Sequence, residues 1–309
     1  MGGPAIIVAT GALPEYGGAT QGVQMLLRFV DEVSPGIARY RLDLDELYPD
    51  GKGRARFEAR WPEFVASTAD HGGLFAREAD SIVYRTESFL PREHDGRTPV
   101  LLVLGNPASH SVRAGMCFAF EKGHGTEHRF WQALAAAKWL SFSDALGTPE
   151  EDGEVRNARR RADLLAGRYE SPFLVGIDLF FTFPSPASAP VWAGVSGLVK
   201  LFGRPAIRLI AAAERTRLAA TISRYVTGQG VVVAFQRDAY EGLRDQLAPP
   251  YTLADARGGR LQSDSAAGCP VRLFGAPPTR MAHTQMFRRV LVEYAEAIAG
   301  TWPSVQLLQ

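Results

Sequence analysis

The sequence predicts an α/β protein with three layers, in which helices cover both faces of a central parallel four-stranded sheet and an N-terminal extension precedes this core. From residue 98 onward, short apolar runs alternate with longer segments of helical periodicity, which is the order of strands joined by crossover helices. Each apolar run is hydrophobic at successive positions, so both faces of its strand are expected to be buried. Hydrophobic residues form 46% of the 309 residues, which is enough for a large core.

The N-terminal extension, residues 1–97, is expected to cover or extend the sheet. The run AIIVAT predicts a short strand, and ARYRLDLDEL alternates apolar and polar residues as a half-buried strand does. Between these runs, helical spacing relates Val23, Leu26, Leu27, Val30 and Val33. This spacing predicts a helix that begins near Thr20, and FEARWPEFVAS predicts a further helix. The loop TGALPEYGG lacks GxGxxG spacing, which argues against a nucleotide- or dinucleotide-binding enzyme.

Residues 98–309 form the predicted core. Its strands are expected at PVLLVLGNP, FLVGIDLFFTF, GVVVAF and PVRLFGAPP. Its helices are expected at TEHRFWQALAAAKWL, AIRLIAAAERTRLAATISRYV, RDAYEGLRDQL and AHTQMFRRVLVEYAEAIAG. Ligands of such sheets bind beyond the carboxyl ends of the strands. The loops 105–125, 183–197 and 275–284 follow three of these strands, so we expect the functional site there.

The composition excludes several classes of site. Cys117 and Cys269 form no CxxC pair, so neither a zinc site nor an iron–sulfur cluster is predicted, and no cofactor is expected. The two free cysteines are compatible with a reducing cytoplasm. No apolar run is long enough to span a membrane, and the opening residues lack the features of a signal peptide. Nothing in the sequence points to an obligatory protein partner.

The first predicted core strand ends abruptly at Gly105, Asn106 and Pro107. A strand that stops in such a turn presents its last groups to a ligand in open α/β proteins. Asn106 is the polar side chain of this turn, and its amide oxygen can accept a hydrogen bond from a water molecule. The alternative is an asparagine that is simply tolerated in a tight turn.

The segment GNPASHSVRAGMCFAFEKGHGTEHRFW resembles the first motif of the uracil-DNA glycosylase superfamily, especially of its mismatch-specific branch. Gly105, Asn106 and Pro107 match the Gly-(Ile)-Asn-Pro turn of that motif, and Phe118 matches the ring that stacks on the flipped base. Residues 129–131 match its Arg-Phe-Trp. The resemblance covers roughly residues 98–300 and leaves residues 1–90 unexplained.

The resemblance implies a monofunctional DNA glycosylase whose partner is double-stranded DNA with a modified base. Asn106 is then the catalytic residue that orients the attacking water. The residues implied to bind the substrate are Gly105, Pro107, Ser109, His110, Phe118 and Phe183. Core packing is the alternative for Phe118 and its neighbour Phe120, and a structural role is the alternative for His110.

Two departures from the superfamily concern the base that is removed. Phe183 stands where the second strand commonly ends in an asparagine that reads the pyrimidine edge. The last strand is followed by GAPPTRM in place of His-Pro-Ser-Pro or Asn-Pro-Ser. Selection of the base would then rest on pocket shape and on contacts to an added group.

Local basic runs are the candidate contacts to DNA, although the net charge of the chain is only +1. Lys200, Arg204 and Arg208 belong to one run, and RNARRRADLLAGR forms a second run. A solvated face is the alternative for both runs. The resemblance places Thr279, Arg280 and Met281 in a loop that enters the minor groove.

These observations lead to a ranked set of functions. The first is removal of a bulky modified base, such as glucosylated hydroxymethylcytosine in phage DNA, as some bacterial members of the superfamily do in antiviral defence. Three features favour it: Phe183 in place of an amide, small residues such as Ala108, Ala114 and Gly115 in the first loop, and the N-terminal extension. The alternatives are a uracil or thymine mismatch repair glycosylase and a non-catalytic DNA-binding module on the same fold.

Overall fold

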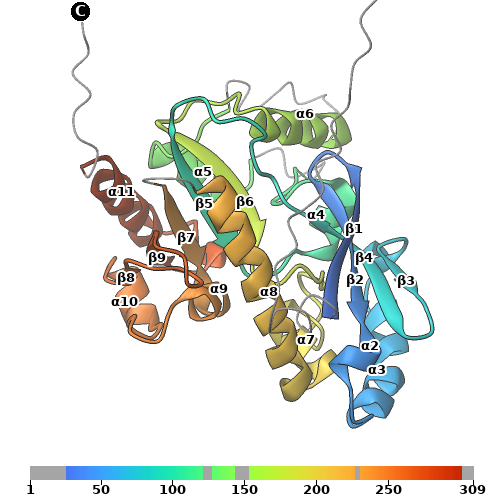
Figure 1. Cartoon of the computed structure of the whole chain (residues 1–309). Helices are drawn as coiled ribbons and strands as arrows, with labels where there is room; N and C mark the ends of the chain where they lie inside the picture. Colours follow the sequence, from blue (N-terminus) through green and yellow to red (C-terminus); the bar gives the residue numbers. More distant parts are fainter. Residues whose placement is uncertain (1–25, 121–126, 143–152, 227–229, 301–309) are drawn as a thin grey trace, which may run out of the picture.

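The computed structural model of the chain describes residues 26–120, 127–142, 153–226 and 230–300. It contains a five-stranded sheet in the order β6-β5-β7-β9-β8 and a four-stranded sheet in the order β1-β2-β4-β3 (Figure 1). The predicted α/β class is therefore confirmed. The strand predicted at AIIVAT and the predicted helix start at Thr20 lie outside the described residues.

The five-stranded sheet is mostly parallel. The four strands predicted for the core are all part of it: β5 (Thr98–Leu104), β6 (Phe173–Leu179), β7 (Val231–Phe235) and β9 (Arg272–Ala276). They run parallel to their neighbours, whereas β8 (Gln262–Ser263) pairs antiparallel with β9. The sheet thus has one more strand than predicted. The sequence gives little signal for β8, because a strand of 2 residues has no measurable periodicity.

Helices cover both faces of this sheet, and alternate residues of each strand face opposite sides. Leu101 and Val103 pack with α8 (Arg204–Tyr225) and α9 (Gln236–Leu243), whereas Val100 and Leu102 pack with α5 and α11. The remaining core helices are α4 (Ser109–Ala114), α5 (Arg129–Ala136), α6 (Gly153–Leu165), α7 (Gly194–Phe202), α10 (Leu253–Arg257) and α11 (Gln285–Ala299), with a 3₁₀ turn η2 at Thr279–Met281. The predicted three layers follow from this arrangement. No helix in the described part of the chain is long and apolar enough to cross a membrane.

The N-terminal segment forms the second, antiparallel sheet. Its elements are β1 (Leu27–Ser34), β2 (Ile37–Asp43), α2 (Leu44–Leu47), α3 (Arg54–Ala66), η1 (Ala69–His71), β3 (Phe75–Arg77) and β4 (Ser81–Glu87). The predicted strand over ARYRLDLDEL and the helix over FEARWPEFVAS are confirmed as β2 and α3.

The helix predicted up to Val33 is wrong in its described part, where the chain forms β1. Val30 and Val33 are 43% and 44% exposed, so the helical spacing does not correspond to a buried face. The turn at Pro35 and Gly36 instead folds β1 back onto β2; Gly36 has φ +79°, and a Cβ there would lie 2.8 Å from the ring of Phe89. Cross-strand pairing therefore decides the conformation here.

The two sheets are joined at the free edge of β6. Backbone hydrogen bonds of 2.8 Å run in both directions between Phe89 and Ile177 of β6. The hydroxyl of Tyr84 in β4 lies 2.7 Å from Oγ1 of Thr182, and the hydroxyl of Tyr48 donates to the carbonyl oxygen of Phe202. The N-terminal sheet consequently shares one hydrophobic core with α7 and α8. The proposed boundary at residues 97 and 98 stays a prediction.

Glu87, the last residue of β4, is a buried carboxyl group. It is 2% exposed, and its Oε2 has no hydrogen-bond partner among the described residues. Burial raises the pKa of Glu87 to about 8, because a carboxylate loses its hydration in the protein interior. At neutral pH the folded protein therefore holds a proton at Glu87 that the unfolded chain has already released.

We expect this proton to make the protein less stable as the pH rises. Between about pH 4.5 and about pH 8 the folded state binds more protons at Glu87 than the unfolded state, so the free energy of unfolding falls across this window. Glu87→Gln removes the titration, and its stability relative to the parent protein should increase across the same window. Chemical denaturation at several pH values measures the effect, with the exposed Glu93→Gln as control. An equal pH dependence for parent and Glu87→Gln would contradict the assignment.

Candidate functional site

The loop after β5 is held by the segment after β6. Phe181 N donates to Gly105 O at 2.7 Å, and Ser185 N donates to Pro107 O at 3.1 Å. Ser109 N donates in turn to Ser185 O at 2.9 Å. The pairing of the two parallel strands thus continues past their ends, and it fixes the backbone of the turn that the sequence singled out.

Asn106 lies half-buried at the centre of this turn. Its Nδ2 donates to Oγ of Ser185 at 2.8 Å and to its neighbour's carbonyl, Pro107 O, at 3.3 Å. Ser185 is itself 1% exposed, so it is a fixed acceptor. Oδ1 of Asn106 accepts no hydrogen bond from the described residues, which leaves this oxygen as an oriented acceptor for a water molecule. The amide nitrogen of Asn106 is thus turned toward the protein and its oxygen away from these partners, which is the orientation that the predicted role requires.

Gln236 is a site residue that sequence reasoning missed. It is the first residue of α9, directly after β7, and it has φ +67°. A Cβ on Gly105 would lie 1.5 Å from Nε2 of Gln236, so the amide of Gln236 rests on the glycine and would have to move if a side chain stood there. A non-glycine residue with positive φ costs about 1–3 kcal/mol, and such residues concentrate at functional sites. The available signal was an amide directly after the apolar run VVVAF, the same pattern as at Asn106.

Phe118, the predicted stacking ring, is half-buried and has φ +50°. Its ring centroid lies 4.3 Å from that of Phe130 and 4.7 Å from that of His128, with interplanar angles of 32° and 25°. Both rings therefore pack closely against Phe118. Nε1 of Trp131 also donates to Phe118 O.

Phe183 belongs to the core and not to the site. It is 1% exposed, and its ring packs against Tyr84 at 4.7 Å, Phe202 at 5.0 Å and Phe75 at 5.1 Å. The expectation that Phe183 contacts the substrate is therefore corrected. The reason is tertiary packing: the N-terminal sheet supplies Phe75 and Tyr84 against the ring of Phe183, which places that ring in the core.

The remaining residues of the predicted substrate site lie on α4. Ser109 is buried, and its Oγ has no partner among the described residues. His110 is half-buried on the first turn of the helix. The space beside Gly115, which was expected to accommodate a substituent, is filled by the guanidinium of Arg161, whose Nη1 donates to Gly115 O at 2.8 Å.

The segment 279–281 forms η2 directly beyond β9, at the same edge of the sheet. Arg280 is exposed, whereas Thr279 and Met281 are half-buried. Met281 packs on the core, and Nη2 of Arg257 approaches its sulfur at 4.0 Å. Arg280 is thus at the surface, where it could reach DNA, and the predicted contact of residues 279–281 with the minor groove stays a prediction.

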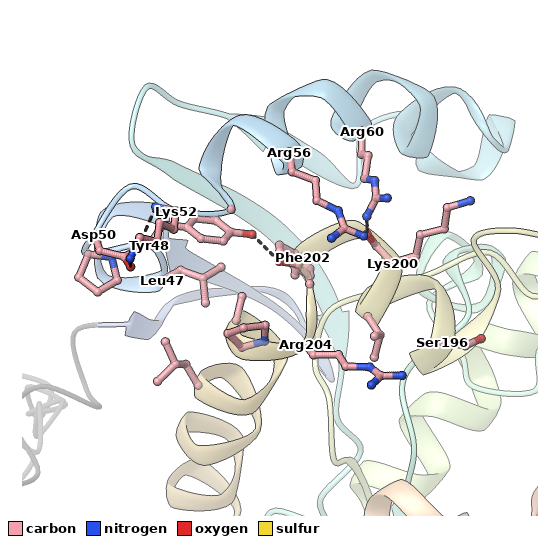
Figure 2. A pocket seen from close by; sticks show the side chains of 17 residues that line it. Leu47, Tyr48, Asp50, Lys52, Arg56, Arg60, Ser196, Lys200, Phe202 and Arg204 are labelled. Atoms are coloured by element: carbon pink, nitrogen blue, oxygen red, sulfur yellow. Dashed lines mark hydrogen bonds and ion pairs between the residues drawn. The ribbon is translucent and has the colours of Figure 1, made fainter.

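The two basic runs have different environments. Lys200 and Arg204 line a surface groove, and Arg208 is exposed one turn further along α8 (Figure 2). In the second run, by contrast, Arg156 and Arg160 are buried. Arg156 lies 4.2 Å from the ring centroid of Phe120, so this part of the run supports the core and does not face phosphates.

A buried ion network lies behind the loop. Arg217 donates from Nε to Glu214 at 2.7 Å and from Nη1 to Asp178 at 2.9 Å. Glu214 accepts from both the backbone N and Oγ1 of Thr182, and Thr182 also contacts the hydroxyl of Tyr84. Burial raises the pKa of Glu214, and the two carboxylates raise the pKa of Arg217 against the lowering effect of its own burial. The network therefore fixes the segment that positions Ser185.

Comparison with protein-family models and with curated proteins finds no match for this chain. Among the described residues, no group of His, Cys, Asp and Glu side chains has the arrangement of a metal site.

Arg217→Met should destabilise the protein by about 3–5 kcal/mol, because it leaves two buried carboxylates without their cation. Denaturant unfolding measures this change. Arg224→Met, an exposed arginine on the same helix, is the matched control and should change stability by less than about 0.5 kcal/mol. Equal stabilities of the two variants would show that the network does not support the fold.

Proposed function

We propose that the protein is a monofunctional DNA glycosylase that hydrolyses the N-glycosidic bond of a flipped-out modified base. The observation that carries the proposal is the geometry of Asn106, whose Nδ2 is bound to Ser185 while Oδ1 accepts no hydrogen bond from the described residues. The motif that contains Asn106 resembles the first motif of the uracil-DNA glycosylase superfamily. Its position at the carboxyl end of a central parallel strand supports a fold of that kind.

The chemistry begins with extrusion of the target nucleotide, which costs a few kcal/mol of unstacking. Oδ1 of Asn106 then accepts a hydrogen bond from a water molecule and holds it beside C1′ of the sugar. The water oxygen bonds to C1′, the C1′–N bond breaks with its electron pair on the departing base, and the released proton passes to solvent. An amide is a weak base, so positioning is its main contribution and modest turnover is expected.

The substrate that we propose is a modified cytosine of phage DNA, such as glucosylated hydroxymethylcytosine, and the proposed role is antiviral defence in the cytoplasm. Support comes from the small side chain of Ala108 next to the Asn106 turn and from the N-terminal sheet, whose β4 packs against α4 after this turn. Uracil or mismatch repair is the alternative. It is favoured by Gln236, whose amide lies at the sheet edge and can hydrogen-bond a pyrimidine.

A DNA-binding module without catalysis is the second candidate function, and one observation favours it. The ring of Phe118, which is the expected stacking surface, already packs against the rings of Phe130 and His128. A binding module needs no such surface. Formation of alkali-labile sites in modified DNA separates the two functions, because only a glycosylase produces them.

The substrate is tested with matched duplexes that carry uracil, a thymine mismatch, cytosine, hydroxymethylcytosine or glucosylated hydroxymethylcytosine. We expect release of the glucosylated base and intact cytosine. Release of uracil with the glucosylated base untouched would replace the proposed substrate by the repair alternative. Failure to release any of these bases, with DNA still bound, would favour the binding module.

Asn106→Ala should reduce single-turnover base release by at least about a hundredfold, because the water loses its acceptor. Folding should be preserved, since the side chain is only half-buried. Gln262→Ala, which truncates an exposed amide on β8, is the matched control. Unchanged release by the Asn106 variant would contradict the proposed mechanism.

A further inference from the structure

A basic groove separates the N-terminal segment from the seam between α7 and α8. It has a volume of about 910 Å³ and is lined from both sides (Figure 2). Lys52, Arg56 and Arg60 come from the N-terminal segment, and Lys200 and Arg204 come from the seam. In Figure 2, Arg56 and Arg60 extend from α3 toward the opposite wall. This groove is not part of the Asn106 site.

The positive charge in the groove is largely uncompensated. Lys52 pairs with Asp50 at 3.6 Å, the acidic residue of the lining. Arg60 donates to the backbone oxygen of Lys200, which does not neutralise either side chain. Within the described part of the chain, no carboxylate forms an ion pair with Arg56, Arg60, Lys200 or Arg204. Several cations held close together in one hollow attract a multiply charged anion.

The spacing of these cations fits an extended anion better than a compact one. Arg56 and Arg60 are four residues apart on α3, so they lie about 6 Å apart along the helix axis. Arg204 and Arg208 have the same separation on α8, and Arg208 continues the line of charge beyond the groove. A small ligand would not extend along both helices.

The floor of the groove indicates which part of the anion is contacted. Tyr48 and Phe202 line it, but both rings are buried in the core, and the hydroxyl of Tyr48 is bound to Phe202 O. No aromatic face of these two residues is free to stack a base, which base-reading single-strand sites require. The cations therefore suit backbone phosphates, and binding is expected to be independent of sequence.

We propose that the basic groove binds the phosphate backbone of DNA and that the N-terminal segment is a DNA-binding element. Figure 1 shows α3 next to α7 at the lower right, beside the lower part of α8. The wall formed by α7 is also continuous in sequence with the segment that holds Asn106. The inference rests on the proposed function for the identity of the polymer, and it deepens that function by assigning Lys52, Arg56 and Arg60 to it.

The test is binding of unmodified duplex and single-stranded oligonucleotides, measured by fluorescence anisotropy at several salt concentrations. The double variant Arg56→Ala, Arg60→Ala should weaken the binding of two duplexes of unrelated sequence to the same extent. It should also reduce the slope of log affinity against log salt concentration by about 2, roughly one per lost phosphate contact. Arg56→Ala alone leaves the hydrogen bond of Arg60 intact and should reduce the slope by about 1. The matched control combines Arg85→Ala with Arg224→Ala, which removes the same charge from exposed positions outside the groove.

The outcomes separate this inference from the proposed function. A salt slope equal to that of the parent in both groove variants would overturn the inference, even if base release persists. A reduced slope with no base released from any substrate would uphold the groove and reject the glycosylase. Absence of DNA binding by the parent would overturn the inference. A nucleoside triphosphate that binds in an Arg56-dependent way, with DNA binding independent of Arg56, would also overturn it.

Discussion

The buried ion network around Glu214 is the constraint on which the candidate site depends. Glu214 binds Arg217 and both donors of Thr182, and Arg217 also binds Asp178 of β6. Charges removed from water are tolerated only with such partners, so this geometry cannot relax without a large cost in stability. Because Thr182 begins the segment that ends at Ser185, α8 determines where the acceptor of Asn106 lies. The rigidity of the loop after β5 therefore comes from a helix on the face of the sheet and not from the loop itself.

The same segment also connects the N-terminal sheet to the site. Tyr84 of β4 reaches Thr182 through its hydroxyl, and its ring packs on Phe183. Phe183 continues into a cluster of rings with Phe75 and Phe202. The N-terminal segment is consequently part of the support of the Asn106 loop as well as one wall of the basic groove. The N-terminal sheet and the α/β core therefore share one hydrophobic cluster, and a change in either can move the Asn106 loop.

Backbone strain at the carboxyl edge of the sheet marks the same region. Gln236 has a positive φ directly beside Gly105, and Phe118 has a positive φ where its ring packs against Phe130 and His128. Each costs about 1–3 kcal/mol, and the surrounding packing has to maintain it. The amide of Gln236 and the acceptor oxygen of Asn106 thus belong to neighbouring strand ends, β7 and β5, which pair in the sheet. An edge with two oriented amides can hold a water and a polar base together.

The sequence by itself determined the α/β class, the four parallel strands and the turn at Asn106, because apolar runs, helical periodicity and a glycine-proline turn are local signals. Only the tertiary structure decided the rest. It converted the helix expected up to Val33 into β1, since pairing with β2 outweighs the spacing of valines that remain exposed. It assigned Phe183 to the core and Ser185 to Asn106, and it brought Gln236 onto Gly105. These contacts join residues far apart in the chain, so they depend on how strands and helices pack, which no local pattern specifies.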